Sequence, residues 1–207
     1  EEGIDNDLVV DADEEVFEMN NGCICCTVRG DLIRILSGLM KRADQLDAII
    51  VETTGLADPA PVAQTFFVDQ DVADRTKLDA IVTVADAVHL EGQLGEHHEA
   101  EEQVAFADVV LLNKTDLIED HSLGLIENRI RKINPYAKII KTAHCAAPLD
   151  EIVGLNAFSL ERVLEVEPDF LESDHDHDHD DDITSVSYVS DTPLDLEKFQ
   201  AWFGKVL

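Results

Sequence analysis

The sequence is poor in basic residues, and this shortage excludes several classes of partner. Its 207 residues contain 15 Lys and Arg against 45 Asp and Glu, which gives a formal net charge of −30 at pH 7. A phosphate backbone or an anionic membrane attracts a protein through a basic footprint. We therefore expect neither nucleic acid nor a membrane surface as a partner.

Long apolar runs are also lacking. No stretch reaches the roughly 20 apolar residues that a transmembrane helix needs, although 45% of the residues are hydrophobic, as in globular proteins. No basic segment followed by an apolar one opens the chain, and no Met precedes the first residues, EEGIDND. We expect a cytoplasmic protein, and a chain that begins inside its domain.

Cysteine is scarce as well, but three of the four cysteines are crowded together. Cys23, Cys25 and Cys26 lie in the stretch NNGCICCTVRGDL, whereas Cys145 is far away. In a reducing compartment such a group favours metal or redox chemistry over a disulfide, and a bond between adjacent cysteines would be strained. Thiolates suit zinc and other late transition metals, and three of them leave a fourth tetrahedral position open for transfer.

Three other readings of the cysteine cluster are less favoured. An iron–sulfur cluster usually takes four cysteines, so Cys145 would have to fold back to serve. The spacing C-x-C-C is not that of thioredoxin-like redox sites. Buried apolar cysteines account poorly for three thiols in a loop flanked by Gly. The pattern therefore predicts a metal site.

Short apolar runs alternate with helix-like stretches along the chain. The runs are LDAIIVETTG (46–55), LDAIVTVADA (78–87), ADVVLLNKTDL (107–117) and AKIIKTAH (137–144), with VFEMNNG as a further expected strand. Unbroken Val, Ile and Leu suit strands buried on both faces of a parallel sheet. GDLIRILSGLMKRA and GLIENRIRKI have the spacing of amphipathic helices. The pattern predicts an α/β fold, a mostly parallel sheet with helices on both faces.

The composition changes near residue 170, which predicts a domain boundary. Residues 1–170 form the predicted α/β domain, and the acidic, histidine-rich segment 171–183 is expected to be a solvated linker. In 184–207, ITSVSYVSD alternates like a strand, and PLDLEKFQAWFGKVL begins a helix near Pro193. Two elements cannot bury a core alone, so we expect the start of a second, α+β C-terminal domain.

The motif NKTD directly follows the buried run DVVLL. The Asp116 carboxylate can accept hydrogen bonds from the ring N–H and the exocyclic amine of guanine, while Asn113 meets another edge group and the Lys114 stem packs on the ring. Adenine lacks that amine and would leave the carboxylate unpaired. The pattern favours a guanine nucleotide site. An ordinary polar loop is the alternative, because short patterns arise often by chance.

A second motif, VETTGLADP (51–59), follows the first apolar run. Glu52 ends that predicted strand, where a carboxylate needs a cation or donors. Gly55 lets its backbone N–H approach a terminal phosphate. Glu52 near Mg²⁺ and Gly55 near the γ-phosphate would form a hydrolysis switch that senses the nucleotide state. The alternative is that Glu52 merely caps the next turn.

Together, GCICC (22–26), ETTGLADP (52–59), NKTD (113–116) and the histidine-rich run before SVSYVSDTPLDLEKFQAWF resemble the CobW-type metallochaperone GTPases. These are P-loop proteins related to the urease and hydrogenase nickel-insertion GTPases. The resemblance implies a P-loop GTPase-like fold and a GTP hydrolase that couples GTP and Mg²⁺ to delivery of a divalent metal to a client metalloprotein. It also implies that Glu1 adds a carboxylate ligand to the cysteine site.

Zn²⁺ is the expected metal, from the thiolates and the family resemblance. Co²⁺ or Ni²⁺ remain options, as does a cobalt chaperone for cobalamin synthesis or a nitrile hydratase activator. Two readings from other classes are a passive metal buffer and a nucleotide-switched assembly factor with a structural metal. We expect a monomer or a weak homodimer.

One part of the implied machinery is missing from the sequence. No G-x-x-x-x-G-K loop followed by Ser or Thr occurs in it. The resemblance places that phosphate-binding loop upstream of Glu1, so we expect an internal fragment that hydrolyses little or no GTP by itself.

The run DHDHDHDDD is a separate metal candidate. In an extended chain His175, His177 and His179 lie on one side and can bind zinc, nickel or cobalt loosely, and the carboxylates raise the local cation concentration. The alternative is an acidic linker with incidental histidines. Four further histidines have no ligand-like setting and are expected at the surface: His89, His97, His98 and His121.

Overall fold

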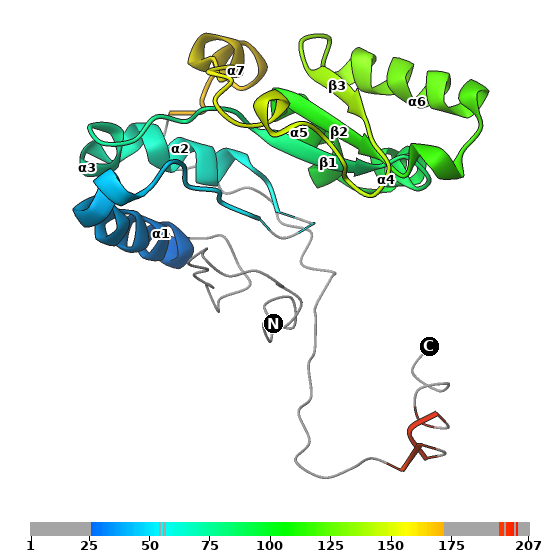
Figure 1. The fold of residues 1–207 in the computed structure, drawn as a ribbon, viewed down its shortest axis with the longest axis horizontal. Helices are drawn as coiled ribbons and strands as arrows, with labels where there is room; N and C mark the ends of the chain where they lie inside the picture. Colours follow the sequence, from blue (N-terminus) through cyan, green and yellow to red (C-terminus); the bar gives the residue numbers. More distant parts are fainter. Residues whose placement is uncertain are drawn as a thin grey trace. The chain divides into compact units, whose positions relative to one another are not determined.

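The structure is a computed structural model that describes residues 26–53, 55, 57–171, 195, 196, 198–200 and 202. In chain order its elements, with 3-10 helices written η, are α1 (Cys26–Leu39), η2 (Met40–Gln45), α2 (Ala60–Val68), α3 (Gln70–Ala73), β1 (Val82–Asp86), α4 (Leu90–Glu96), α5 (His98–Phe106), β2 (Val109–Asn113), η3 (Thr115–Leu117), α6 (Asp120–Ile133), β3 (Lys138–Lys141), η4 (Leu149–Glu151) and α7 (Leu160–Val166). Figure 1 shows their arrangement.

Three of the predicted apolar runs form a parallel sheet in the order β1-β2-β3. Val82 pairs with Val109, and Leu111 pairs with Ile140. Because each crossover passes through helices, α4 and α5 after β1 and α6 after β2, the chain returns to the same end of the sheet before each strand. The prediction of an α/β fold with a mostly parallel sheet is confirmed.

The predicted strand at 46–55 is wrong. The described residues from Leu46 to Thr53 belong to neither a helix nor the sheet. Ile50 is 83% exposed and Glu52 is also exposed. The segment therefore has the apolar composition of a buried strand, but these side chains are not buried. A strand needs at least one neighbouring strand to pair with, and the local sequence pattern does not show whether such a neighbour is present.

The faces of the sheet are set by the alternation of side chains along β2. Val110 and Leu112 pack in one core with residues from α4, α5 and α6, where Val104 and Ile130 are among the most buried. The opposite-facing residues of β2 are buried as well, Val109 at 1% and Leu111 at 5% exposure. Such two-sided burial explains why β2 is an uninterrupted apolar run.

A second core lies around a group of phenylalanine rings, Phe106 of α5 among them. Phe67 stacks on Phe158 with ring centroids 5.3 Å apart, and Phe170 meets Phe67 edge-on at 6.3 Å. Ala60 and Ala63 of α2 and Val163 of α7 are buried in the same cluster. This core joins α2 to α7, which are far apart in sequence.

Local sequence explains where several helices begin. Asp69 caps α3 through a 3.0 Å hydrogen bond from the Val72 backbone N–H, and Ser159 caps α7 through one of 3.3 Å from the Arg162 N–H. α6 has an acidic first turn and basic residues in its last turn, which complement the helix dipole. The predicted helix directly after the cysteines is confirmed by α1.

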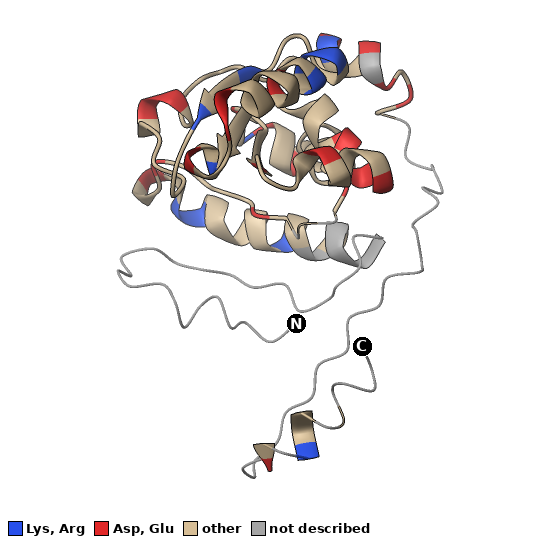
Figure 2. Ribbon diagram, turned by 90° about the vertical axis from the view of Figure 1, so that its right-hand side faces the viewer, with Lys and Arg blue, Asp and Glu red and all other residues tan. Residues whose placement is uncertain are grey.

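The chain falls into two units, Cys23–His175 and a unit made of 1–22 and 176–207. In the described part of the latter, Asp195 caps a helical turn by accepting a 3.2 Å hydrogen bond from the Lys198 N–H, within the predicted C-terminal helix. No helix of the described residues is long and apolar enough to cross a membrane. Figure 2 shows acidic residues on many of the described elements and fewer basic ones.

Candidate functional site

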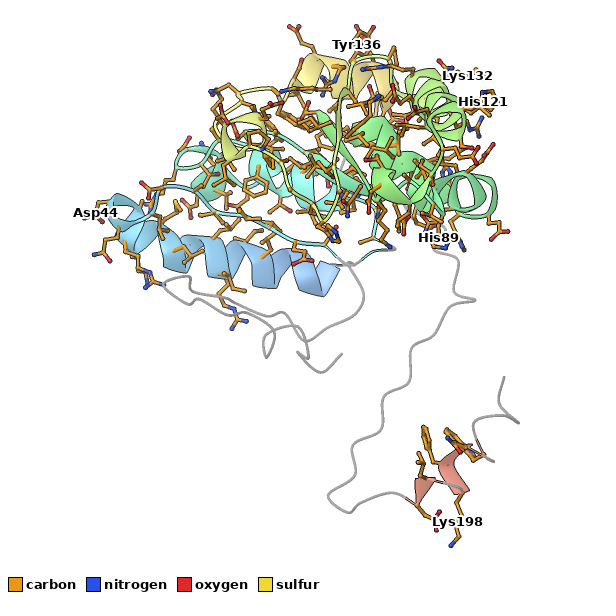
Figure 3. All side chains as sticks on the ribbon, turned by 45° about the vertical axis from the view of Figure 1, so that its right-hand side comes forward. Asp44, His89, His121, Lys132, Tyr136 and Lys198 are labelled. Carbon is orange, nitrogen blue, oxygen red and sulfur yellow. The ribbon has the colours of Figure 1, made fainter. Side chains whose placement is uncertain are left out.

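Polar residues gather where the three parallel strands end. Asp86 ends β1, Asn113 ends β2 directly beside it in the register, and Thr142 follows β3. A 2.9 Å hydrogen bond from the Ala87 N–H to the Asn113 carbonyl ties the first two ends together. His89 lies at this end of the unit and Tyr136, just before β3, at the opposite one (Figure 3). Ligands bind at the carboxyl edge of such sheets, so this is the candidate site.

Asn113 joins the loop after β2 to the loop after β3. Its side-chain oxygen accepts hydrogen bonds from the Thr142 hydroxyl at 3.1 Å and from the Cys145 backbone N–H at 2.9 Å. The Thr115 hydroxyl in turn donates to the Thr142 carbonyl at 3.0 Å. His144 and Cys145 both have φ of 53°, a left-handed backbone that turns this loop back towards Asn113. Asn113 thus holds the walls of the site in place.

Lys114 is held by the neighbouring strand. Its backbone is left-handed, with φ of 63°, and its ammonium lies 2.6 Å from Oδ2 of Asp86. His89 Nδ1 lies 3.0 Å from the same oxygen, and the Val88 N–H donates to Oδ1 at 2.8 Å. Burial raises the pKa of Asp86, but the hydrogen bonds from Lys114, His89 and Val88 outweigh it and hold the pKa well below its usual range. Asp86 is therefore a fixed anion that orients Lys114.

Asp116 lies in the short helix η3 next to these residues. Its side chain is exposed, and no hydrogen bond or ion pair joins it to another of the described residues. The predicted base-recognition residues are thus brought together at one sheet edge. Two of them are tied to neighbours, and the carboxylate of the third is available to a ligand.

Glu52 and Gly55 lie on the loop before α2. Glu52 is exposed, and a Cβ added at Gly55 would meet no described atom within 4 Å, so this backbone is open to an approaching ligand. The loop is held by Gln103 of α5, whose Nε2 donates to the Gly55 carbonyl at 3.1 Å and to the Ala57 carbonyl at 2.9 Å. Among the described residues, no hydrogen bond joins this loop to the Asn113–Asp116 motif.

The predicted metal ligands fall largely outside the described residues. These are Glu1, Cys23, Cys25, His175, His177 and His179, together with the side chain of Cys26. Within the described part of the chain, no group of three His, Cys, Asp or Glu is placed to hold a metal ion. The cysteine site and the histidine run stay predictions.

The sequence reasoning missed three residues of the site. Asp86 ends an apolar run as Glu52 does, so the same strand-end rule could have found it. His89 was expected as a plain surface residue. It is exposed, but it contacts Asp86. Gln103 carries no sequence signal, because its partners lie 46 and 48 residues away.

A parallel α/β sheet with these strand-end residues is the framework of a nucleotide-binding domain of the P-loop class. The model of the family CobW/HypB/UreG, nucleotide-binding domain, matches residues 1–141. The chain belongs to this family of P-loop GTPases. The resemblance drawn from the sequence is thereby confirmed.

Two curated relatives show the range of the similarity. The chain is 39% identical over 156 residues to the zinc-regulated GTPase metalloprotein activator 1 of Schizosaccharomyces pombe, covering 74% of this chain and 38% of the relative. It is 32% identical over 203 residues to the zinc chaperone YjiA of Escherichia coli, covering 96% of this chain and 62% of the relative. The chain thus spans roughly two fifths to three fifths of these relatives' lengths.

A solved structure supports the fold. The crystal structure of the Zn(II)-bound YjiA GTPase from E. coli matches with a TM-score of 0.56 and 32% identity, over 69% of this chain and 42% of that chain. Because the sequence identity to this structure is 32%, the structural similarity supports both the fold and the family assignment.

Proposed function

We propose that this chain is the nucleotide- and metal-handling part of a GTP-dependent zinc chaperone. The observation that carries the proposal is the strand-end cluster, in which neighbours hold Asn113 and Lys114 while the Asp116 carboxylate has no partner among the described residues. An exposed carboxylate on a fixed frame is a ready acceptor for the two N–H groups of guanine. The relatives named zinc chaperone and zinc-regulated GTPase metalloprotein activator support the same function.

The loop of Glu52 and Gly55 is proposed to sense the terminal phosphate. Glu52 is exposed and unpaired among the described residues, which suits a carboxylate that faces a hydrated Mg²⁺. Mg²⁺ supplies neutralisation of phosphate charge when it is bound. The backbone at Gly55 is open, so its N–H can meet a γ-phosphate that GTP has and GDP lacks.

Phosphate binding needs a further part. A chain of charge −30 repels a polyanion unless a lysine and a nest of backbone amides offset it. We propose that a phosphate-binding loop upstream of Glu1 supplies these groups. The name extended protein is used below for this chain joined to such a loop.

The metal is proposed to bind at Cys23, Cys25 and Cys26. Three thiolates form three corners of a tetrahedral zinc site, and an open fourth position suits release to a client metalloprotein, with Glu1 as a further ligand before transfer. α1 begins at Cys26, and the switch residue Glu52 follows η2 along the chain. Metal and γ-phosphate can therefore bias the same segment, which is the requirement for coupling.

The histidine run is proposed to collect metal loosely before it reaches the thiolates. His175, His177 and His179 alternate with Asp, which concentrates cations near a weak imidazole site. A weak site of this kind can hand its ion to the tighter thiolates.

Cobalt titration tests the metal site in this chain itself. We expect thiolate-to-metal charge-transfer absorption in the reduced protein, and zinc should compete it away. Replacing Cys25 and Cys26 by Ser should abolish the absorption. The triple change of His175, His177 and His179 to Ala is the matched control and should leave the absorption in place. Absorption that survives the cysteine changes would place the site elsewhere.

The nucleotide part is tested in the extended protein. GTP should bind far more tightly than ATP, and zinc affinity should differ between the states with a non-hydrolysable GTP analogue and with GDP. This chain alone should hydrolyse little or no GTP beside the extended protein. Equal turnover by both would show that other residues bind the phosphates, and zinc affinity independent of nucleotide would favour a passive metal buffer.

A further inference from the structure

Gln103 connects three parts of the domain through one residue. It lies on α5, and its side-chain amide donates to the carbonyls of Gly55 and Ala57, at 3.1 Å and 2.9 Å. Its own backbone carbonyl accepts a 2.6 Å hydrogen bond from the Thr83 hydroxyl of β1. The loop that carries Gly55 is thereby fastened to the sheet by way of α5.

The helix that carries Gln103 is a firm support. Val104, the next residue, is 1% exposed in the core beneath the sheet, and Phe106 is 5% exposed in the aromatic core. Glu101 on the same helix pairs with Arg129 of α6, with 3.0 Å between guanidinium nitrogen and carboxylate oxygen. A residue fixed among such contacts can hold a loop in place at little entropic cost.

The loop itself has few apolar contacts of its own. Gly55 is exposed, and Ile50 on the segment leading to it is 83% exposed. Ala57 is 8% exposed, so burial of the loop begins close to one of the two carbonyls that Gln103 binds. Segments with little burial are those that sample several arrangements.

We infer that Gln103 is a positioning residue for the terminal phosphate of the nucleotide, an inference that rests on the proposed GTPase function. A single amide that donates to the carbonyls of Gly55 and Ala57 restrains the loop backbone at these two residues, and the N–H proposed to meet the γ-phosphate belongs to the first of them. Gln103 thus presents the Gly55 backbone to the γ-phosphate without the cost of ordering the loop at that moment. GDP has no γ-phosphate, so the binding of GDP does not use the contact between the Gly55 backbone and that phosphate.

The inference makes different predictions for GTP and GDP. Two neutral hydrogen bonds hold the loop, and their loss should lower kcat for GTP hydrolysis by about tenfold or more. The affinity for GDP should change less than about twofold, because the base and the remaining phosphates keep their contacts. A purely structural role would weaken both nucleotides together.

The test compares variants of the extended protein. Gln103→Leu removes both donors, and Gln103→Glu keeps the size and helical preference of the side chain while it replaces the amide by an acceptor. Both should lower kcat and leave GDP affinity in place. Gln93→Leu on α4 is the matched control, since Gln93 is exposed and its side chain has no hydrogen bond among the described residues. Its kcat should equal that of the parent.

Two results would overturn the inference. One is an unchanged kcat in Gln103→Glu, the variant that keeps the size and helical preference of the side chain. The other is an equal loss of GDP and GTP affinity in that variant. An extended parent protein that neither binds nor hydrolyses GTP would instead defeat the proposed function, and the inference with it. The parent measurement therefore separates the two failures.

Discussion

Replacing Asn134 should clearly lower the free energy of unfolding of this domain. Asn134 is 3% exposed, and its amide nitrogen donates to three carbonyls at the end of α5, those of Val104 at 2.9 Å, Ala105 at 2.9 Å and Ala107 at 2.8 Å. Its side-chain oxygen accepts from the N–H groups of Tyr136 and of Ala137, both at 3.0 Å. One side chain thus completes the hydrogen bonding of two chain segments.

Replacing Asn134 by Leu keeps the number of side-chain heavy atoms and their branching, and it removes all five hydrogen bonds. Those to Val104, Ala107 and Ala137 are buried, and each buried group left unpaired costs about 1–3 kcal/mol. The Val104 carbonyl keeps a 3.3 Å bond from the Ala107 N–H, so the loss should be nearer about 3–5 kcal/mol than the full sum. Against a total stability of about 5–15 kcal/mol, such a loss leaves a marginal domain.

Urea unfolding of this chain, followed by far-ultraviolet circular dichroism, measures the effect. Asn134→Asp is a second variant. It keeps the shape and the acceptor but turns an oxygen towards the three carbonyls, so it should be at least as harmful at pH 7. Asn128→Leu is the control, because Asn128 is exposed on α6 and should change stability by less than about 0.5 kcal/mol. A loss below about 1 kcal/mol in both Asn134 variants would refute the accounting of buried groups.

Three further predictions concern other residues. Asp116→Asn in the extended protein should shift preference from guanine towards xanthine nucleotides, measured by competition; equal binding of ATP and GTP by the parent would contradict the assignment. Arg162→Leu should cost about 3–5 kcal/mol in urea unfolding, because it leaves the buried Asp108 carboxylate without its cation, and a cost below about 1 kcal/mol would show that the pair is dispensable. Hydrogen bonds to Asp79, the Asn156 N–H foremost, lower its pKa, so its stabilisation is complete above the unfolded value near about pH 4 and is lost as the pH falls through the folded pKa. Asp79→Asn should therefore weaken the acid dependence of the melting temperature, and an unchanged dependence would speak against this role.

The sequence predicted the local elements of the fold better than its long-range contacts. The runs at 78–87, 107–117 and 137–144 became β1, β2 and β3, because unbroken apolar residues need burial on two faces. The run at 46–55 has the same composition but no place in the sheet of described residues. Whether such a run is buried depends on partners that lie elsewhere in the chain, and no local pattern contains that information.

The candidate site shows the same division. Asn113, Lys114 and Asp116 were found together because they are adjacent in sequence and follow a strand. Gln103 was not found, since its partners lie 46 and 48 residues away, and the pairing of Asp86 with Lys114 spans 28 residues. Residues of this kind become visible once the strands are in register, because pairing sets which strand ends meet.

The free edge of β1 has a consequence for handling the protein. Among the described residues β1 pairs with β2 alone, and Val84 in its middle is 61% exposed. An open edge beside apolar side chains is a template for pairing with another chain. The net charge of −30 opposes such contacts, because the molecules repel one another. Salt weakens this repulsion: at 0.1 M, charges that lie more than about 10 Å apart are largely screened from each other. Colloidal stability of this chain should therefore fall as ionic strength rises, so dilute buffers preserve it.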